Sequence, residues 1–299
     1  MIVGLSKKKQ SVQAFILLMP SLLIALTFIY LPSIYVLFLS FQDWDMISPQ
    51  KISVGFLNYI RLLQPENGFW NSFGRTLYYT LIFIPGTLVI SLGIALMIVK
   101  LKNFKGVFQS LFFIPSVTSI SVIAIVWSYL FNPQIGFLNS FLSFLGVAQN
   151  QLPQWLNSIK MALPSIAVIG IWSNIGFMSL LFIAGLQNIP KTYYEAAEID
   201  GAKSFTIFRH ITLPLLSPVT YYVLFMLMIN SFKMFDIISI MTKGRPQGST
   251  NVLLYYVYQN AFQFFDAGLA SAASWLIFVM LLALFLLQQK LGEKNVYYQ

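Results

Sequence analysis

The apolar stretch TLYYTLIFIPGTLVISLGIALMIV, residues 76–99, decides the fold class of this chain. It contains no charged side chain, and about 20 apolar residues in a helix cross the roughly 30 Å hydrocarbon layer of a membrane. In lipid, the backbone amides must find hydrogen-bond partners within their own segment, which favours a helix over a strand. The stretch is therefore predicted to be a transmembrane helix.

Five more apolar runs of similar length accompany it, at residues 14–41, 107–131, 161–186, 218–241 and 267–287. The whole chain is 58% hydrophobic and only 9% charged, whereas soluble domains are about 25% charged. We therefore expect an all-α polytopic membrane protein with six transmembrane helices. These helices form one membrane domain, residues 14–289, between an N-terminal segment, residues 1–13, and a tail, residues 290–299.

Basic residues at the ends of the apolar runs indicate their orientation. One set of flanks is rich in them: Lys7, Lys8, Lys9, Lys100, Lys102, Lys105, Lys191, Lys203, Arg209, Lys290 and Lys294. The opposite loops carry fewer: Lys51, Arg61, Lys160, Lys243 and Arg245. By the positive-inside rule, both termini are predicted to be cytoplasmic. The net charge of +9 therefore follows the topology, and no basic face for nucleic acid accompanies it.

Two connections on the opposite side are long enough to fold, residues 42–75 and 132–160. Within the second, the segment 137–147 is apolar but too short to span the membrane, which favours an interfacial helix over a seventh crossing. Prolines lie inside four of the runs: Pro20, Pro32, Pro85, Pro115 and Pro164. Each one bends a helix axis, which either curves the bundle or opens a space between its helices.

A polar stretch, EAAEIDGAKSFTIFRHITLP at residues 195–214, separates the fourth run from the fifth. Pro190 suits the start of a short helix, and Gly201 suits its end. A second helix is expected to begin with Ser204 as its cap and to stop before Pro214. The acidic residues in the first helix, Glu195, Glu198 and Asp200, fit poorly against an anionic membrane surface. A docking site for a basic partner protein is therefore favoured over an amphipathic connector.

The spacing of this stretch resembles the EAA loop of bacterial ATP-binding-cassette (ABC) importer permeases of the carbohydrate-uptake type. The similarity continues in VWSYLFNPQIGFLN, residues 126–139, and in MFDIISIMTKGRP, residues 234–246, where Arg245 replaces a glycine that relatives often carry. The resemblance implies a type I ABC importer permease fold, with cytoplasmic EAA coupling helices in the loop 188–217 between helices 4 and 5. The residues that match the family's ATPase-coupling positions are Glu195, Ala196, Ala197, Asp200, Gly201, Ile211, Leu213 and Pro214.

The resemblance also implies a set of partners. The details are most similar to the first permease of a sugar or oligosaccharide importer of the bacterial inner membrane. Such a chain pairs with a second, homologous permease as a heterodimer, and two ATP-binding-cassette ATPase subunits and an extracytoplasmic solute-binding protein complete the complex. The chain has no GxxxxGK[ST] loop for ATP phosphates, so ATP hydrolysis is expected in a partner and the chain is not expected to be an enzyme.

Polar residues within the fourth and fifth runs are candidates for the solute pathway: Trp172, Asn174, Ser179, Tyr222, Asn230, Lys233 and Asp236. A lysine or an aspartate at the centre of a span costs about 2.5–3.5 kcal/mol on insertion scales, so these side chains are expected to face a cavity or a neighbouring helix. Their three-residue spacing permits Lys233 and Asp236 to pair on one helix face. A structural ion pair and a solute contact are equally compatible with that pattern, and Trp172 is compatible with plain packing.

Two other classes of function are weaker fits. An ion-coupled secondary transporter normally needs carboxylates within the membrane, and Asp236 is the only acidic residue well inside a predicted span. A membrane-embedded enzyme needs a catalytic or metal-binding cluster, and the chain has one histidine and no cysteine. The sequence predicts no cofactor and no metal site, and it does not identify the carbohydrate.

Overall fold

The computed structural model describes residues 7–295. Within them, five helical segments are long and apolar enough to cross a membrane: Gln13–Leu39, Phe69–Lys100, Ala162–Asn188, Ser217–Met241 and Ala267–Lys290. A bent pair of helices makes a sixth if it is counted as one span. The prediction of an all-α polytopic protein is confirmed. Residues 1–6 and 296–299 lie outside the described residues, so the predicted terminal segments 1–13 and 290–299 are covered only in part.

The membrane segments follow the apolar runs closely. The first consists of α1 (Lys7–Ala25), a π-helical turn η1 (Leu26–Tyr30) and α2 (Leu31–Leu39), and the second is α4 (Phe69–Lys100). The fourth is α8 (Ala162–Asn188), and the last is α15 (Ala267–Asn295). Because α4 begins at Phe69, the predicted loop 42–75 ends earlier than expected: Arg75 lies within a helix. The aromatic residues that precede Arg75 lie within α4, which therefore begins about two turns before the predicted start at residue 76.

The third run is not one straight helix, which corrects the prediction of a continuous span at 107–131. It consists of α5 (Lys105–Val117) and α6 (Ile120–Leu130), which are bent by 94°. Pro115 lacks a backbone donor, and Thr118 and Ser119 then take extended ψ angles of 140° and 128°. The Thr118 hydroxyl donates to the Ile114 carbonyl at 2.8 Å, which satisfies one acceptor at the end of α5.

The fifth run is also interrupted, which corrects the expected continuous helix at 218–241. It consists of α12 (Ser217–Phe232) and α13 (Asp236–Met241), and the residues between them are not helical. Irregular backbone at membrane depth is tolerated where it lines a cavity or is buried in protein. The break therefore marks the position of a site within the fifth run.

The chain forms two compact units, which are described separately. Among the described residues, the first unit is formed by residues 7–67 and 257–277. In it the predicted loop after the first span folds as a short antiparallel hairpin of β1 (Gln42–Asp43) and β2 (Ile52–Ser53), followed by α3 (Leu57–Leu63) and η2 (Pro65–Asn67). The unit also contains η6 (Gln259–Gln263) and the first turns of α15. The hairpin has only two residues per strand, so side chains must hold this region together.

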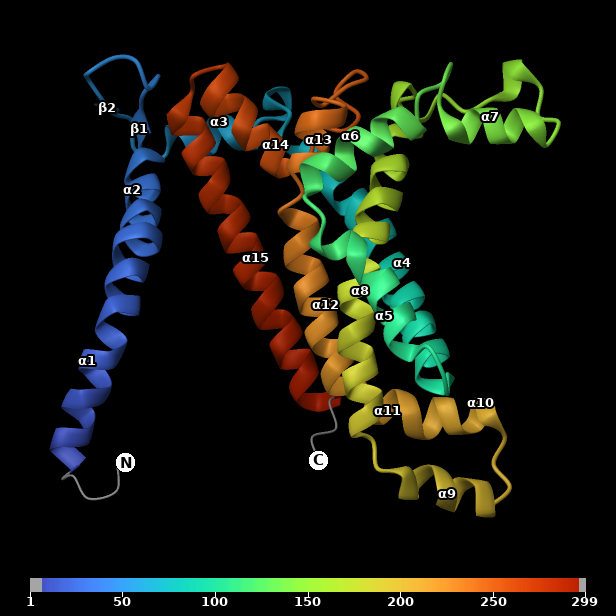
Figure 1. Ribbon diagram of the computed structural model, residues 1–299. Helices are drawn as coiled ribbons and strands as arrows, with labels where there is room; N and C mark the ends of the chain where they lie inside the picture. Colours follow the sequence, from blue (N-terminus) through green and yellow to red (C-terminus); the bar gives the residue numbers. More distant parts are fainter. Residues whose placement is uncertain (1–6, 296–299) are drawn as a thin grey trace. The chain divides into compact units, whose positions relative to one another are not determined.

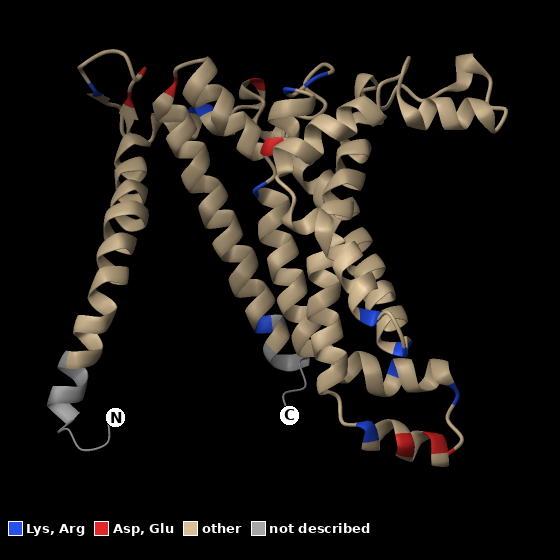
Figure 2. Cartoon of the chain, viewed as in Figure 1, with Lys and Arg blue, Asp and Glu red and all other residues tan. Residues whose placement is uncertain are grey.

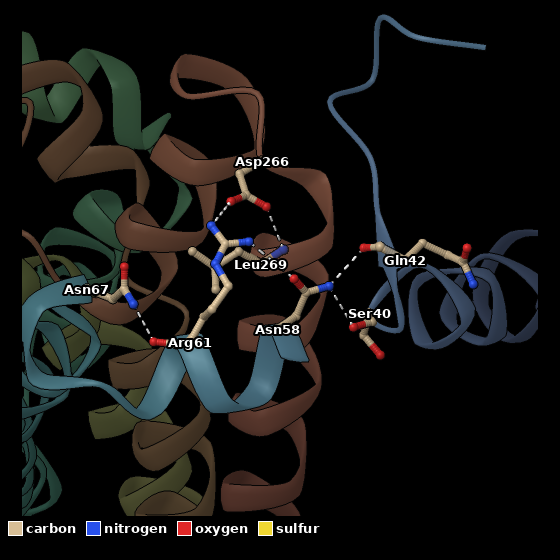
Figure 3. Close-up of polar contacts among 7 residues, drawn as sticks. All are labelled: Ser40, Gln42, Asn58, Arg61, Asn67, Asp266 and Leu269. Carbon is tan, nitrogen blue, oxygen red and sulfur yellow. Dashed lines mark hydrogen bonds and ion pairs between the residues drawn. The ribbon is translucent and has the colours of Figure 1, made fainter. Parts of the chain in front are cut away.

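Two side chains of α3 make those contacts (Figure 3). The buried Asn58 amide donates to the carbonyls of Ser40 at 3.0 Å and Gln42 at 2.8 Å. The Arg61 guanidinium forms an ion pair with Asp266 at 2.7 Å, and the second Asp266 oxygen accepts the Leu269 backbone N–H at 2.9 Å. The carboxylate therefore caps the start of α15 while it binds α3.

The second unit is formed by residues 68–256 and, in the described part of the C-terminal helix, 278–295. In it α4, α5 and α8 run side by side, and α12 packs against α4 and α8 (Figure 1). It also contains α7 (Phe137–Phe144), η3 (Gln149–Gln151), η4 (Trp155–Asn157) and most of α14 (Leu253–Tyr258). The first eight residues of the short apolar segment 137–147 form a helix, α7, which ends at Phe144, and Phe144 is 85% exposed on it.

Glycines let the helices of the second unit approach closely. A Cβ atom at Gly176 would lie 2.0 Å from the Phe112 carbonyl oxygen of α5, and one at Gly170 would lie 2.3 Å from the Tyr79 hydroxyl of α4. Small residues commonly mark such contacts between membrane helices, because they let the backbones come together. The close approach places the polar face of α8 beside α4 and α5.

Candidate functional site

The polar loop between the fourth and fifth membrane segments forms two short helical arms beyond the ends of α4, α5 and α8 (Figure 1). The first arm is α9 (Lys191–Ile199), with Pro190 directly before it. Gly201 follows with φ +75°. The Gly201 N–H donates to the Glu198 carbonyl at 3.0 Å, and the Ala202 N–H donates to the Ala197 carbonyl at 2.9 Å. This pair of bonds is a Schellman motif, so the predicted helix end at Gly201 is confirmed.

The second arm differs from the prediction at both ends. It consists of α10 (Ser204–Ile207), the π-helical turn η5 (Phe208–Thr212) and α11 (Leu213–Leu215). Lys203 occupies the cap position and Ser204 is already helical, without a side-chain cap bond. The helical conformation continues through Pro214, because the wider π turn lets the Leu213 N–H donate to the Phe208 carbonyl before the proline removes a donor.

The surface of the two arms combines apolar and acidic side chains. Ile199 is 87% exposed and Phe205 is 71% exposed. The acidic residues Glu195, Glu198 and Asp200 are also exposed, and Figure 2 colours the acidic positions of α9 red. Ala197 faces inward and is buried. Large exposed apolar side chains next to charges are typical of a protein-binding surface.

A second candidate site lies at the break in the fifth membrane segment. We call it the Asn230 cavity; it has a volume of about 260 Å³ and is lined by parts of α4, α6, α8, α12 and α13. Its lining residues are Tyr79, Phe83, Ile120, Gly170, Ser173, Asn174, Asn230, Lys233, Met234, Phe235, Asp236 and Ile237. Four of the seven predicted pathway residues are therefore brought together: Asn174, Asn230, Lys233 and Asp236.

Two asparagines connect the walls of this cavity. The Asn230 amide donates to the Asn174 side-chain oxygen at 3.3 Å, and the Asn174 amide donates to the Gly170 carbonyl at 2.9 Å. The rings of Tyr79 and Phe83 stack with centroids 5.3 Å apart. The cavity thus offers amide donors and acceptors beside aromatic faces.

Lys233 and Asp236 lie at the two ends of the helix break, so they do not share a continuous helix face as predicted. Lys233 is the C-cap of α12, and Asp236 is the first residue of α13. Both side chains are exposed and both line the Asn230 cavity. They do not form an ion pair with each other; the ion pair found among the described residues joins Arg61 and Asp266. The sixteen residues of α12 rise about 24 Å at 1.5 Å per residue, and Lys233 follows at the end of this rise.

Comparison with known proteins decides what kind of protein carries these two sites. The family model described as "Binding-protein-dependent transport system inner membrane component" matches residues 66–294. The chain belongs to this family. It is therefore a multi-pass inner membrane protein, a permease component of an ABC transport system.

Individual relatives match the permease over nearly its whole length. The trehalose/maltose transport system permease protein MalF of Thermococcus litoralis is 33% identical over 287 residues, 96% of each chain. The arabinooligosaccharides transport system permease protein AraP of Bacillus subtilis is 33% identical over 278 residues, 91% of this chain and 86% of the relative. A crystal structure of a bacterial alginate ABC transporter, in complex with its alginate pentasaccharide-bound periplasmic protein, contains a chain of the same fold: the TM-score is 0.83, the identity 22%, and 96% of each chain is covered.

The three other predicted pathway residues of the permease lie away from the Asn230 cavity. Trp172 packs edge-on against Trp127 with centroids 5.6 Å apart, which agrees with its reading as a packing residue. The buried Ser179 hydroxyl donates to the Gly176 carbonyl of its own helix at 2.8 Å. Tyr222 is 48% exposed and does not line the cavity.

Sequence reasoning missed the aromatic wall of the permease cavity. Tyr79 and Phe83 lie within the apolar stretch at residues 76–99, where nothing in the sequence distinguishes them from residues that face lipid. Gly170 carried a weak signal, because a glycine within a span often marks a close helix contact. Within the described residues, no group of three His, Cys, Asp or Glu side chains is placed to hold a metal ion.

Proposed function

We propose that this permease imports a sugar or an oligosaccharide across the membrane, driven by ATP hydrolysis in two partner ATPase subunits. The observation that carries the proposal is the Asn230 cavity, a polar space beside a broken membrane helix. Relatives whose names refer to trehalose and maltose and to arabinooligosaccharides support it. A second homologous permease and an extracytoplasmic solute-binding protein complete the proposed complex.

The side chains that line the cavity suit the binding of a sugar through its hydroxyl groups. Asparagine amides donate and accept hydrogen bonds at once, and the ring faces of Tyr79 and Phe83 offer an apolar wall for the C–H side of a sugar. The volume of about 260 Å³ is just below the 300–1,000 Å³ of pockets for drug-sized ligands. One sugar unit at a time, and not a whole oligosaccharide, would therefore occupy it.

The two-armed loop is the proposed contact with the ATPase. Its acidic and apolar side chains protrude from the unit, and a groove lined by basic residues on the ATPase would match them. The coupling residues are those of the EAA pattern: Glu195, Ala196, Ala197, Asp200, Gly201, Ile211, Leu213 and Pro214. This assignment places the loop and both termini in the cytoplasm, in agreement with the basic flanks.

Uptake by the complete complex tests the solute assignment. The permease is reconstituted in vesicles with the partners encoded beside it, and uptake of labelled sugars is measured. Asn230→Ala removes one amide contact, and a neutral hydrogen bond is worth about 0.5–1.5 kcal/mol, so uptake at low solute concentration should fall about two- to tenfold. Asn150→Ala, in an exposed turn of η3, is the matched control. Equal uptake by both variants would contradict the role of the cavity.

A further inference from the structure

A second cavity lies between the two-armed loop and the ends of the membrane helices in the second unit. Its volume is about 850 Å³, which makes it more than three times as large as the Asn230 cavity. Its walls come from the last turn of α4, the first residue of α5, the end of α8 and both arms of the loop. We call it the Lys100 cavity. No residue assigned to the solute pathway or to the EAA pattern lines it.

The walls of the Lys100 cavity have two chemical characters. Six apolar residues form one part: Leu96, Val99, Leu186, Ile189, Ile207 and Phe208. Three lysines form another, Lys100, Lys105 and Lys191, with Glu198 as the acidic residue in the lining. Three positive charges against one negative charge leave a net charge of +2. Figure 2 shows the basic residues at the ends of α4 and α5 and at the start of α9.

The lysines of this cavity have no anionic partner in the part of the chain that the structure describes. The ion pair found there joins Arg61 and Asp266, in the other unit. The hydroxyl groups at the cavity wall include Tyr194 and Thr212, which hydrogen-bond to each other at 3.3 Å and join the two arms. The cavity therefore has an excess of donors and a deficit of negative charge.

The position of the cavity selects the kind of anion. It lies at the ends of α4 and α8, two helices long and apolar enough to cross a membrane, and apolar residues of both helices form part of its wall. A free phosphate ion would satisfy the lysines but would gain nothing from the apolar walls. An anionic phospholipid fits both parts, with its phosphate at the lysines and the start of its acyl chains against Leu96 and Leu186. Basic pockets between membrane helices at the cytoplasmic surface bind such headgroups.

We propose that the Lys100 cavity binds the headgroup of an anionic phospholipid, such as phosphatidylglycerol. The bound lipid would contact α4 and α5 through Lys100 and Lys105, and α9 through Lys191. It would therefore connect the first arm of the loop to the membrane helices, and membrane charge would affect how firmly that arm is held. The proposal does not depend on which solute the permease carries.

Lipid binding to the purified chain tests the proposal. The protein is placed in nanodiscs of phosphatidylcholine with phosphatidylglycerol as a minor component, and the lipids that remain bound are measured by native mass spectrometry. The test variant is the triple substitution Lys100→Gln, Lys105→Gln and Lys191→Gln. The control variant is Lys102→Gln, Lys203→Gln and Lys290→Gln, which removes the same charge from exposed lysines that do not line the cavity.

The expected result is at least a tenfold weaker affinity for phosphatidylglycerol in the test variant, equivalent to about 1.4 kcal/mol, and less than a twofold change in the control. Substituting arginine at the same three positions should retain binding, because the charge is kept. Hydrogen exchange of residues 191–215 should slow when phosphatidylglycerol is present, in the wild type and the control only.

Three outcomes would overturn the proposal. Equal loss of binding in both glutamine triples would show general attraction to an anionic surface. Equal retention of phosphatidylglycerol and phosphatidylcholine by the wild type would show that the cavity does not select charge. Slower hydrogen exchange of the loop with inorganic phosphate alone, to the same extent as with the lipid, would assign the site to a free anion.

Discussion

The contact between α5 and α8 gives the sharpest prediction about the fold, through the substitution Gly176→Ala. The new Cβ would lie 2.0 Å from the Phe112 carbonyl oxygen and 2.9 Å from the Phe113 Cα. A carbon and a carbonyl oxygen in contact are about 3.3–3.6 Å apart, so the two backbones must separate by more than about 1 Å. The clash involves backbone atoms, and no rotation of a side chain can relieve it.

The magnitude follows from what the separation disrupts. The Ser116 hydroxyl of α5 donates to the Ser173 carbonyl at 2.9 Å and accepts the Phe177 N–H at 3.1 Å. Overpacking costs about 1–3 kcal/mol, and hydrogen bonds between membrane helices average about 0.6 kcal/mol each. Gly176→Ala should therefore lower the free energy of unfolding by about 2–4 kcal/mol.

The assay is reversible unfolding in mixed micelles, followed by tryptophan fluorescence. Gly93→Ala is the control, because a Cβ there meets no atom within 4 Å and alanine is the better helix former by up to about 1 kcal/mol. The control should be as stable as the wild type or more stable. If Gly176→Ala unfolds within about 0.5 kcal/mol of the wild type, the close contact between α5 and α8 is refuted.

Three further predictions concern the loops. Gly201→Val should strain the left-handed backbone at φ +75° by roughly 1–2 kcal/mol and therefore speed hydrogen exchange in α9. Gly201→Asn should change the exchange rates little. Equal exchange rates in the two variants would contradict the Schellman motif at the end of α9. In the first unit, Asp266→Ala should destabilise the protein more than Asp266→Asn. The asparagine amide oxygen can still accept the Leu269 N–H, so this variant loses only a partly exposed ion pair worth about 1 kcal/mol or less. Equal unfolding free energies for the two variants would contradict this. The backbone N–H of Ser48 is the main donor that lowers the pKa of exposed Asp45, followed by the Ser48 hydroxyl and the Ile47 N–H. The Asp45 carboxylate therefore stabilises the turn fully at pH values above the ordinary pKa of about 3.9. The stabilisation is lost as the pH falls through the lowered pKa. Hydrogen exchange of Ser48 should show that dependence, and Asp45→Ala should lack it.

The membrane segments could be predicted from the sequence because hydrophobicity alone determines them. Each of the six apolar runs coincides with helix in the structure, and Gly201 ends its helix because a left-handed residue is needed there. The breaks could not be predicted in the same way. Residues 118–119 and 233–235 lie inside apolar runs, and whether a polar residue there kinks a helix depends on which neighbour accepts the freed backbone groups.

Contacts between residues far apart in the sequence could not be predicted either. Arg61 and Asp266 are 205 positions apart, and each alone reads as an ordinary loop charge. The aromatic wall at Tyr79 and Phe83 depends on Gly170, because a Cβ atom there would lie 2.3 Å from the Tyr79 hydroxyl and 3.3 Å from the Phe83 ring. The asparagines were found because amides within a span are costly unless they face a partner, and this argument needs no knowledge of the neighbours.

The central claim is that the two-armed loop transmits ATP hydrolysis in partner subunits to a sugar pathway through this permease. Uptake and ATP hydrolysis measured in the same vesicles, with wild type and Glu195→Lys in the complete complex, test it most directly. We predict that wild-type uptake requires ATP and that reversal of the charge at Glu195 lowers uptake at least tenfold, while the inserted amount of permease stays the same. Undiminished uptake by the Glu195→Lys complex, or accumulation of sugar by the permease alone without an ATPase subunit, would contradict the claim.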